Sequence, residues 1–138
     1  MRFIVMGMMP QDAEAGPPPS PDAFAAMQQY NEELAKAGVL VAAEGLTPTS
    51  KGARVKFSGD DRIVIDGPFT ESKELVAGFT ILQVKSKEEA IEWVKRAPNV
   101  SNGDAVVEIR KLMDVEDFSE MMGGDFTPNE EIASVKFR

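Results

Sequence analysis

The sequence contains no cysteine and no histidine among its 138 residues. Without cysteine, the chain can form no disulfide and offers neither a thiolate nucleophile nor a thiolate metal ligand. Without histidine, a Ser-His-Asp triad and a histidine-ligated zinc site are excluded. Any acid–base catalyst must therefore be a carboxyl group, a lysine or a tyrosine whose pKa the fold has shifted. We expect no metal ion and no cofactor.

Long apolar runs and an excess of basic residues are also missing. No apolar stretch approaches the ~18 residues that a membrane span needs, and the opening MRFIVMGMMP lacks the cleavage site of a signal peptide. The formal charge is −8, with basic residues scattered singly or in pairs, which argues against nucleic acid as a partner. We expect a cytoplasmic protein that binds neither membranes nor nucleic acid.

Hydrophobic periodicity predicts a β-α-β unit, a hairpin and a second β-α-β unit. Ser20-Pro21 is typical of a helix start, and Ser86–Glu89 of a capping box. The predicted strands are 2–8, 39–46, 53–57, 62–65, 75–84 and 105–113, and the predicted helices are 21–37 and the segment from Ser86 to about Arg96. The order predicts an α+β fold, a ferredoxin-like β-α-β-β-α-β sandwich over 1–113 with an extra hairpin, followed by a C-terminal extension, 114–138.

Two local predictions accompany this order. The inner face of the first helix is expected to comprise Phe24, Met27, Asn31, Leu34 and Ala37. The Pro/Gly-rich stretch 10–20 is interpreted as a disordered or simple surface loop, with a lid over a nearby cleft as the alternative.

Three of the predicted strands, 2–8, 39–46 and 75–84, are apolar on both faces. Two helices can cover only one face of an antiparallel sheet, and a sheet whose other face meets water normally alternates polar with apolar residues. We therefore expect a second copy of the chain to cover the other face and leave clefts between the protomers. The alternative cover is the C-terminal extension folding back over its own sheet.

Three segments resemble the YCII-related proteins that carry the DGPF signature. They are NEELAKAGVLVAAEGLTPTSKGARVKFSG, DGPFTESKELVAGF and EEAIEWVKRAPN, and they occur in the order typical of that family. The resemblance implies a dimeric α+β barrel of ferredoxin-like halves, and it implies no settled activity. Some relatives are suspected enzymes with a His–Asp pair, and others are similar to proteins encoded beside sigma factors. This chain lacks the histidine of that pair.

The turn at the start of DGPFTESKELVAGF supports two interpretations of Asp66. In the structural one, its carboxylate accepts backbone amides, Gly67 supplies a backbone conformation that other residues resist, and Pro68 fixes φ. In the functional one, Asp66 points into a cleft and acts as a base or binds a cation. Glu71 and Lys73 share a parity on the approach to the following strand. They either form a surface ion pair or line a pocket in which Lys73 holds an anionic ligand.

Two further candidates lie outside that motif. Glu44 interrupts the apolar strand VLVAAEGL, where it either pairs with Arg54 or Lys56 or lines the cleft with a raised pKa. Tyr30 lies on or near the inner face of the first helix, as a packing residue or a ligand contact.

We expect the chain to be a homodimer that binds a small molecule in an intersubunit cleft, with weak lyase- or isomerase-like acid–base activity as an extension of that role. Asp66 is the catalytic candidate, and Glu44, Glu71, Lys73 and Tyr30 are the ligand-binding candidates. The alternative is a non-catalytic regulatory or adaptor protein that acts through protein contacts. The sequence leaves open whether the protein is an enzyme.

Overall fold

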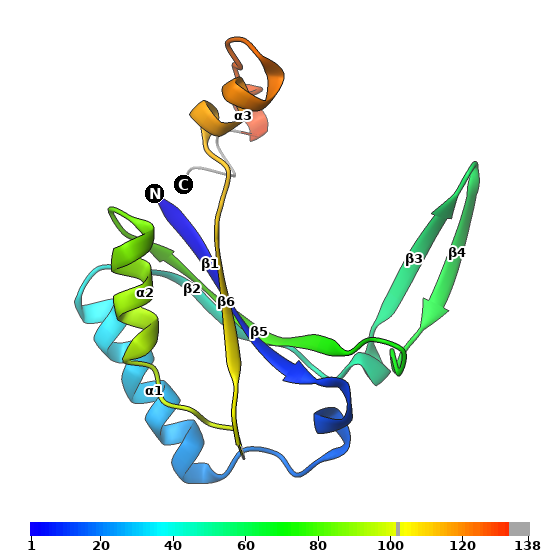
Figure 1. The fold of residues 1–138 in the computed structure, drawn as a ribbon, viewed down its shortest axis with the longest axis vertical. Coiled ribbons are helices and arrows are strands. Elements are labelled where there is room, and N and C mark those ends of the chain that lie inside the picture. Colours follow the sequence, from blue (N-terminus) through cyan, green and yellow to red (C-terminus); the bar gives the residue numbers. More distant parts are fainter. Residues whose placement is uncertain (102, 133–138) are drawn as a thin grey trace.

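The structure, a computed structural model, describes residues 1–101 and 103–132 (Figure 1). Its strands are β1 Arg2–Pro10, β2 Leu40–Gly45, β3 Ala53–Ser58, β4 Asp61–Asp66, β5 Glu74–Gln83 and β6 Val106–Lys111. Its α-helices are α1 Pro21–Lys36, α2 Lys87–Lys95 and α3 Val115–Met122, and its 3-10 turns are η1 Gln11–Ala15 and η2 Thr49–Lys51.

Four of the strands form one sheet in the order β2-β5-β1-β6, with every neighbouring pair antiparallel. Helices α1 and α2 cover one face of it (Figure 1). The fold is thus α+β, as predicted. The core between the helices and the sheet consists of Phe3, Tyr30, Leu34, Val39, Leu82, Val84 and Ala90.

The helix starts follow the predicted capping chemistry. Ser20 caps α1 by accepting the amide of Ala23, and Ser86 caps α2 by accepting the amide of Glu89. The carboxylate of Glu89 accepts the amide of Lys85 and not that of Ser86, so the capping box reaches one residue further back.

The predicted inner face of α1 is wrong at Phe24, whose side chain is 63% exposed, and at Ala37, which is exposed just beyond the helix end. The face that meets the sheet is centred on Met27, Tyr30 and Leu34 instead. Successive helix residues are turned by about 100°, so Phe24 lies well to one side of that face. Tyr30 takes an inner position because its hydroxyl finds a partner there, and donates to the carbonyl of Trp93 at 2.7 Å.

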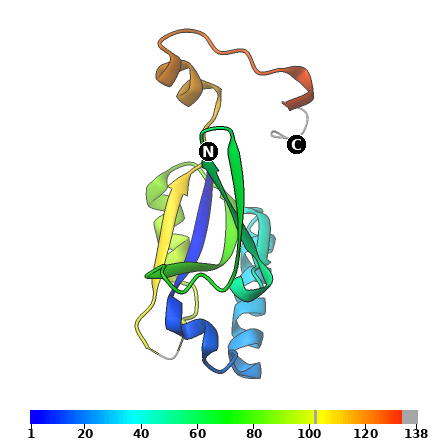
Figure 2. The same ribbon diagram turned by 90° about the vertical axis from the view of Figure 1, so that its right-hand side faces the viewer.

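The hairpin β3–β4 is a separate two-stranded sheet. It projects from the side of the main sheet opposite the helices, as Figures 1 and 2 both show. All twelve residues of its two strands are exposed. The extra hairpin is therefore confirmed, and it stands apart from the body of the chain.

The C-terminal segment follows β6 without returning to the sheet. A left-handed glycine, Gly123, ends α3. The centres of the Phe118 and Phe126 rings lie 5.0 Å apart. Figure 1 shows α3 beyond the end of β6 and not over the open face of the sheet. The alternative in which the extension covers its own sheet is not met by residues 114–132, and 133–138 lie outside the described residues.

Candidate functional site

The turn at residues 66–72 is held by a side chain from a distant part of the chain. The hydroxyl of Thr49 accepts the amide of Phe69 at 3.1 Å and donates to the carboxylate of Glu14 at 2.6 Å. The other oxygen of Glu14 accepts the amide of Thr49 at 2.7 Å. Glu14 thus ties η1 to η2, and Thr49 ties both to the turn. The segment 11–15 is consequently an anchored 3-10 turn, and its interpretation as a plain loop was incomplete.

Gly67 is required by a close approach of two backbones. Its amide donates to the carbonyl of Gly52 at 3.0 Å, and the carbonyl of Thr49 fills the space that a Cβ at position 67 would need. Its φ is not positive, and the peptide bond to Pro68 is cis. The prediction that Gly67 supplies an unusual backbone conformation is therefore wrong, because the requirement is steric.

Arg54 connects the base of the hairpin to the same turn. Its guanidinium lies 3.9 Å from the centre of the Phe69 ring, and Nη2 donates to the hydroxyl of Ser72 at 2.9 Å. A guanidinium stacked on an aromatic face gains cation–π attraction. The hairpin therefore leaves the body with its base fixed by side-chain contacts.

Asp66 stands at the end of β4, opposite Ala53, and is exposed. Among the described residues, its carboxylate takes part in no hydrogen bond or ion pair, so it does not accept the turn amides as the structural interpretation predicted. Thr49 performs that task instead. The carboxylate of Asp66 is left facing solvent.

Glu71 and Lys73 are exposed and precede β5. Because they lie in an irregular turn, the strand-parity argument that placed them on one side does not apply. No ion pair joins them, while the backbone carbonyl of Lys73 accepts the amide of Gln11 at 3.2 Å. They share the turn with Asp66.

Glu44 and Tyr30 lie on opposite faces of the sheet. Glu44 is opposite Phe79 in the β2–β5 ladder, on the face away from the helices, and is exposed. The predicted pairing with Arg54 or Lys56 does not occur, because the hairpin is not part of this sheet. Tyr30 is buried under α2, where desolvation is the main cause that raises its pKa.

The candidates thus do not converge within one protomer. Phe79, beside Glu44, is five residues along β5 from Glu74, which is roughly 16 Å at ~3.3 Å per residue. The turn candidates lie beyond Glu74, and Tyr30 lies behind the sheet. A single site containing all five is not formed by this chain alone.

The uncovered face of the sheet is apolar along its middle. Directly opposed residues in a ladder share a face. In the β1–β5 ladder, Ile4 is opposite Ile81 and Met6 is opposite Phe79. We call this surface the open face; it comprises Ile4, Met6, Met8, Phe79 and Ile81, with Val106 at the edge. Glu44, Glu108 and Arg110 lie on the same side. The two-sided apolar pattern in the sequence predicted this surface.

The YCII-related domain family matches residues 1–116. The chain belongs to the YCII-related family. An uncharacterised protein of Rhizobium meliloti (strain 1021) is 33% identical over 91 residues, which is 66% of this chain and 70% of that protein. The family therefore accounts for the body of the protein but assigns it no activity, and most of α3 with the residues after it lies outside the match.

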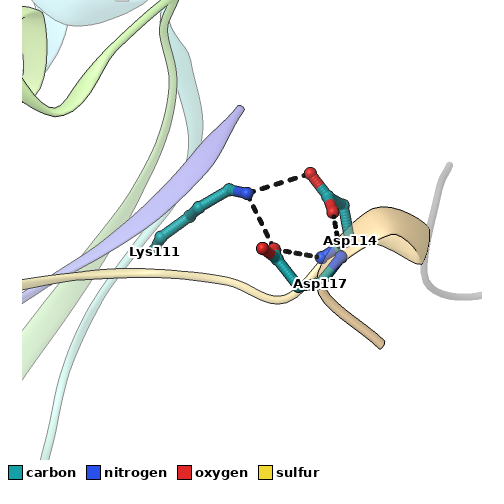
Figure 3. Close-up of polar contacts among 3 residues, drawn as sticks. All are labelled: Lys111, Asp114 and Asp117. Carbon is teal, nitrogen blue, oxygen red and sulfur yellow. Dashed lines mark hydrogen bonds and ion pairs between the residues drawn. The ribbon is translucent and has the colours of Figure 1, made fainter. Parts of the chain in front are cut away.

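At the boundary of the YCII-related domain, an ionic cluster fixes the start of α3 (Figure 3). Lys111 Nζ lies 3.0 Å from an oxygen of Asp114 and 2.7 Å from one of Asp117. Asp114 and Asp117 also form a capping box, each accepting the other's backbone amide. The amide of Asp117 is the main cause that lowers the pKa of Asp114 to about 2, with Lys111 next. This cluster was not predicted from the sequence, although the D-x-x-D spacing after Lys111 could have revealed it.

Other surfaces of the YCII-related domain offer little for binding. A shallow hollow on the outer side of α2 is lined by Glu89, Glu92, Trp93, Lys95 and Arg96, and none of the candidate residues contributes to it. Over residues 1–101 and 103–132, no group of three or more acidic side chains is placed to hold a metal ion. Within the same ranges, no helix has the length and apolar character needed to cross a bilayer.

Proposed function

We propose that this YCII-related protein acts as a homodimer in which the open faces of two sheets meet, and that a small molecule binds in a cleft between the protomers. Each protomer would then be a ferredoxin-like half of a dimeric α+β barrel. The strand order β2-β5-β1-β6, with both helices on one face, supports that assignment.

The observation that carries the proposal is the open face itself. An antiparallel sheet that meets water on one side normally alternates polar and apolar residues, yet Ile4, Met6 and Met8 follow one another along the open side of β1. None of α1, α2 and α3 covers that side of the sheet (Figure 1). A second copy offers a surface of the same character, as a two-fold symmetric contact requires.

The dimer also brings charged groups to the edges of the contact. Glu44 lies at the margin of the open face, and Asp66, Glu71 and Lys73 belong to the turn that leads into β5. Glu44 would meet the other three only through the second copy, because one protomer keeps it apart from their turn. Asp66 is the group that we assign to proton transfer, since its exposed carboxylate has no partner among the described residues. Tyr30, bonded to Trp93, would shape the sheet from behind and would not touch the ligand.

The dimer is tested by placing a charge in the open face. Met6→Glu should convert the protein to a monomer in sedimentation at micromolar concentration, because burying an unpaired carboxylate against Phe79 is costly. Met121→Glu is the matched control, since Met121 is 67% exposed on α3. A Met6→Glu variant that sediments with the wild-type mass would contradict the proposal.

The ligand is tested on protein purified under mild conditions. Native mass spectrometry should find the dimer carrying a small-molecule adduct, and Asp66→Asn and Glu44→Gln should each lower its occupancy. A fully occupied adduct in both variants would remove these residues from the site.

A second role is favoured by one observation, the character of residues 112–132. This segment holds seven acidic residues and no basic one, and Met121 and Met122 on α3 are exposed. Such a surface fits a regulatory or adaptor role in which α3 contacts a basic partner protein. In that case, deleting residues 114–138 should abolish capture of the partner and leave the dimer intact; unchanged capture would exclude α3 as the contact.

A further inference from the structure

The β3–β4 hairpin exposes large apolar side chains, one of which, Phe57, carries the guanidinium of Arg62 4.3 Å from the centre of its ring. Val55, Phe57 and Val64 are 53%, 72% and 65% exposed. In the ladder Val55 is opposite Val64, and Phe57 is opposite Arg62, so these residues share one face of the ribbon with Ala53 and Asp66. We call it the Val55 face. A two-stranded ribbon on its own is marginally stable in water.

The opposite face of the ribbon is occupied at its base. Arg54 belongs to that face, and its guanidinium lies against Phe69 and Ser72 of the chain's own turn. With Gly67 bonded to Gly52 below it, the base of the hairpin is fixed and its Val55 face is turned away from that anchor. The hairpin therefore projects from a fixed base, and its Val55 face is mainly apolar.

The direction of the projection matches the open face. Figures 1 and 2 both show the hairpin leaving on the side of the main sheet that the helices do not cover. A second copy that approaches the open face therefore arrives beside the hairpin. The hairpin and the open face therefore lie on the same side of the main sheet, where one partner can reach both.

The charges of the hairpin suit a second copy more than an unrelated partner. Residues 53–66 hold three basic and three acidic side chains, namely Arg54, Lys56, Arg62, Asp60, Asp61 and Asp66. A chain of charge −8 repels its own copy, so the surfaces that meet must be close to neutral. A strongly acidic or basic partner would call for an imbalance that the hairpin lacks.

The area that a dimer needs points the same way. A stable interface buries about 800 Å² per partner. The central residues of the open face are half-buried already, so they can supply only part of that area. The more exposed Val55, Phe57 and Val64 supply much of the remainder.

We propose that the β3–β4 hairpin is a dimerisation arm whose Val55 face packs against the second copy of the chain. The inference rests on the proposed homodimer. Because Asp66 ends the same face, the arm also places this carboxylate at the boundary between the protomers. The candidate site around Asp66 is then incomplete in one chain.

Phe57→Glu tests the arm, with Phe24→Glu as the matched control, because Phe24 is 63% exposed on α1. We expect Phe57→Glu to raise the dimer dissociation constant at least tenfold and Phe24→Glu to leave it within twofold. Circular dichroism of the dissociated variant should match that of the wild type. If Met6→Glu dissociates the dimer and Phe57→Glu does not, the hairpin is not a dimerisation arm, while the proposed homodimer stands. If the wild type is already monomeric, the homodimer itself fails.

A crosslinking experiment keeps the proposal testable should Phe57→Glu misfold. The chain has no cysteine, so Val64→Cys carries a single thiol for a short photoactivated crosslinker. Illumination should yield covalent dimers from Val64→Cys and none from the control Phe24→Cys. If illuminated Val64→Cys remained entirely monomeric under denaturing conditions, the proposal that the hairpin is a dimerisation arm would be overturned.

Discussion

The carbonyl of Thr49 occupies the space that a side chain at Gly67 would need. Gly67→Ala should therefore force two backbone segments apart and lower the free energy of unfolding by about 2–4 kcal/mol, the range of severe steric substitutions. Gly124→Ala is the control, because nothing lies within 4 Å of its Cβ position, and it should change stability by less than ~0.5 kcal/mol. Urea unfolding of both variants checks this. Equal stabilities would show that the turn tolerates a Cβ.

The hydroxyl of Thr49 joins η1 and the turn through Glu14 and Phe69. Thr49→Val keeps the shape of the side chain but leaves those partners without the hydroxyl, so we expect a loss of about 1–3 kcal/mol in unfolding free energy. Thr49→Ser retains the hydroxyl and should recover most of it. A double-mutant cycle with Glu14→Gln should show coupling between positions 14 and 49, and strict additivity would argue against the contact.

The turn shows what the sequence could and could not predict. Hydrophobic periodicity located the strands of the main sheet, both packed helices and the hairpin. An element buried on one face carries apolar residues at its own structural period, and this spacing is visible in the sequence. Residues 66–69 were also recognised as a turn. Its support from Thr49 and Glu14 could not be predicted, since those residues are far away in the chain and a lone Thr or Glu carries no periodic signal.

Candidate residues were predicted less well, for a related reason. Pairing with the next strand in sequence was one of the two interpretations of Glu44, yet the hairpin forms its own sheet and Arg54 stacks on Phe69 instead. Of the two interpretations of Tyr30, packing residue or ligand contact, the packing one agrees with its burial and its hydrogen bond to Trp93. Single-chain patterns identify which side chains face the core, but they do not indicate which exposed carboxylates come together in an assembly.

Asp66 and Gly67 are adjacent, but substitution should lower the stability of the fold only at Gly67. Because the carboxylate of Asp66 has no partner among the described residues, Asp66→Asn should leave the melting temperature within about 1 °C of the wild type. Any small-molecule adduct or turnover that depends on this carboxylate should nevertheless fall. Thermal unfolding and native mass spectrometry on the same preparation separate the two effects. A large drop in melting temperature would assign Asp66 to the stability of the turn.

The cap of α3 should depend on pH at both extremes. The pKa of Asp114 is lowered from 3.8 to about 2, so its ionised form stabilises the cap above pH 3.8, and this contribution is lost as the pH falls toward 2. The pKa of Lys111 is raised above 10.5, chiefly by its hydrogen bond to Asp117, so its contribution is present below 10.5 and lost at higher pH. The NMR shift of the Asp117 amide should titrate near pH 2. A midpoint near 4 would contradict the capping geometry.

The open face of the sheet is the feature on which the proposed role depends, and the mass of the particle in solution tests it most directly. Sedimentation equilibrium of the wild-type chain at micromolar concentration should give twice the mass of one chain, with Met6→Glu reduced to a single chain. A wild-type particle of one chain's mass across that range would contradict the account, because the intersubunit cleft would then not form.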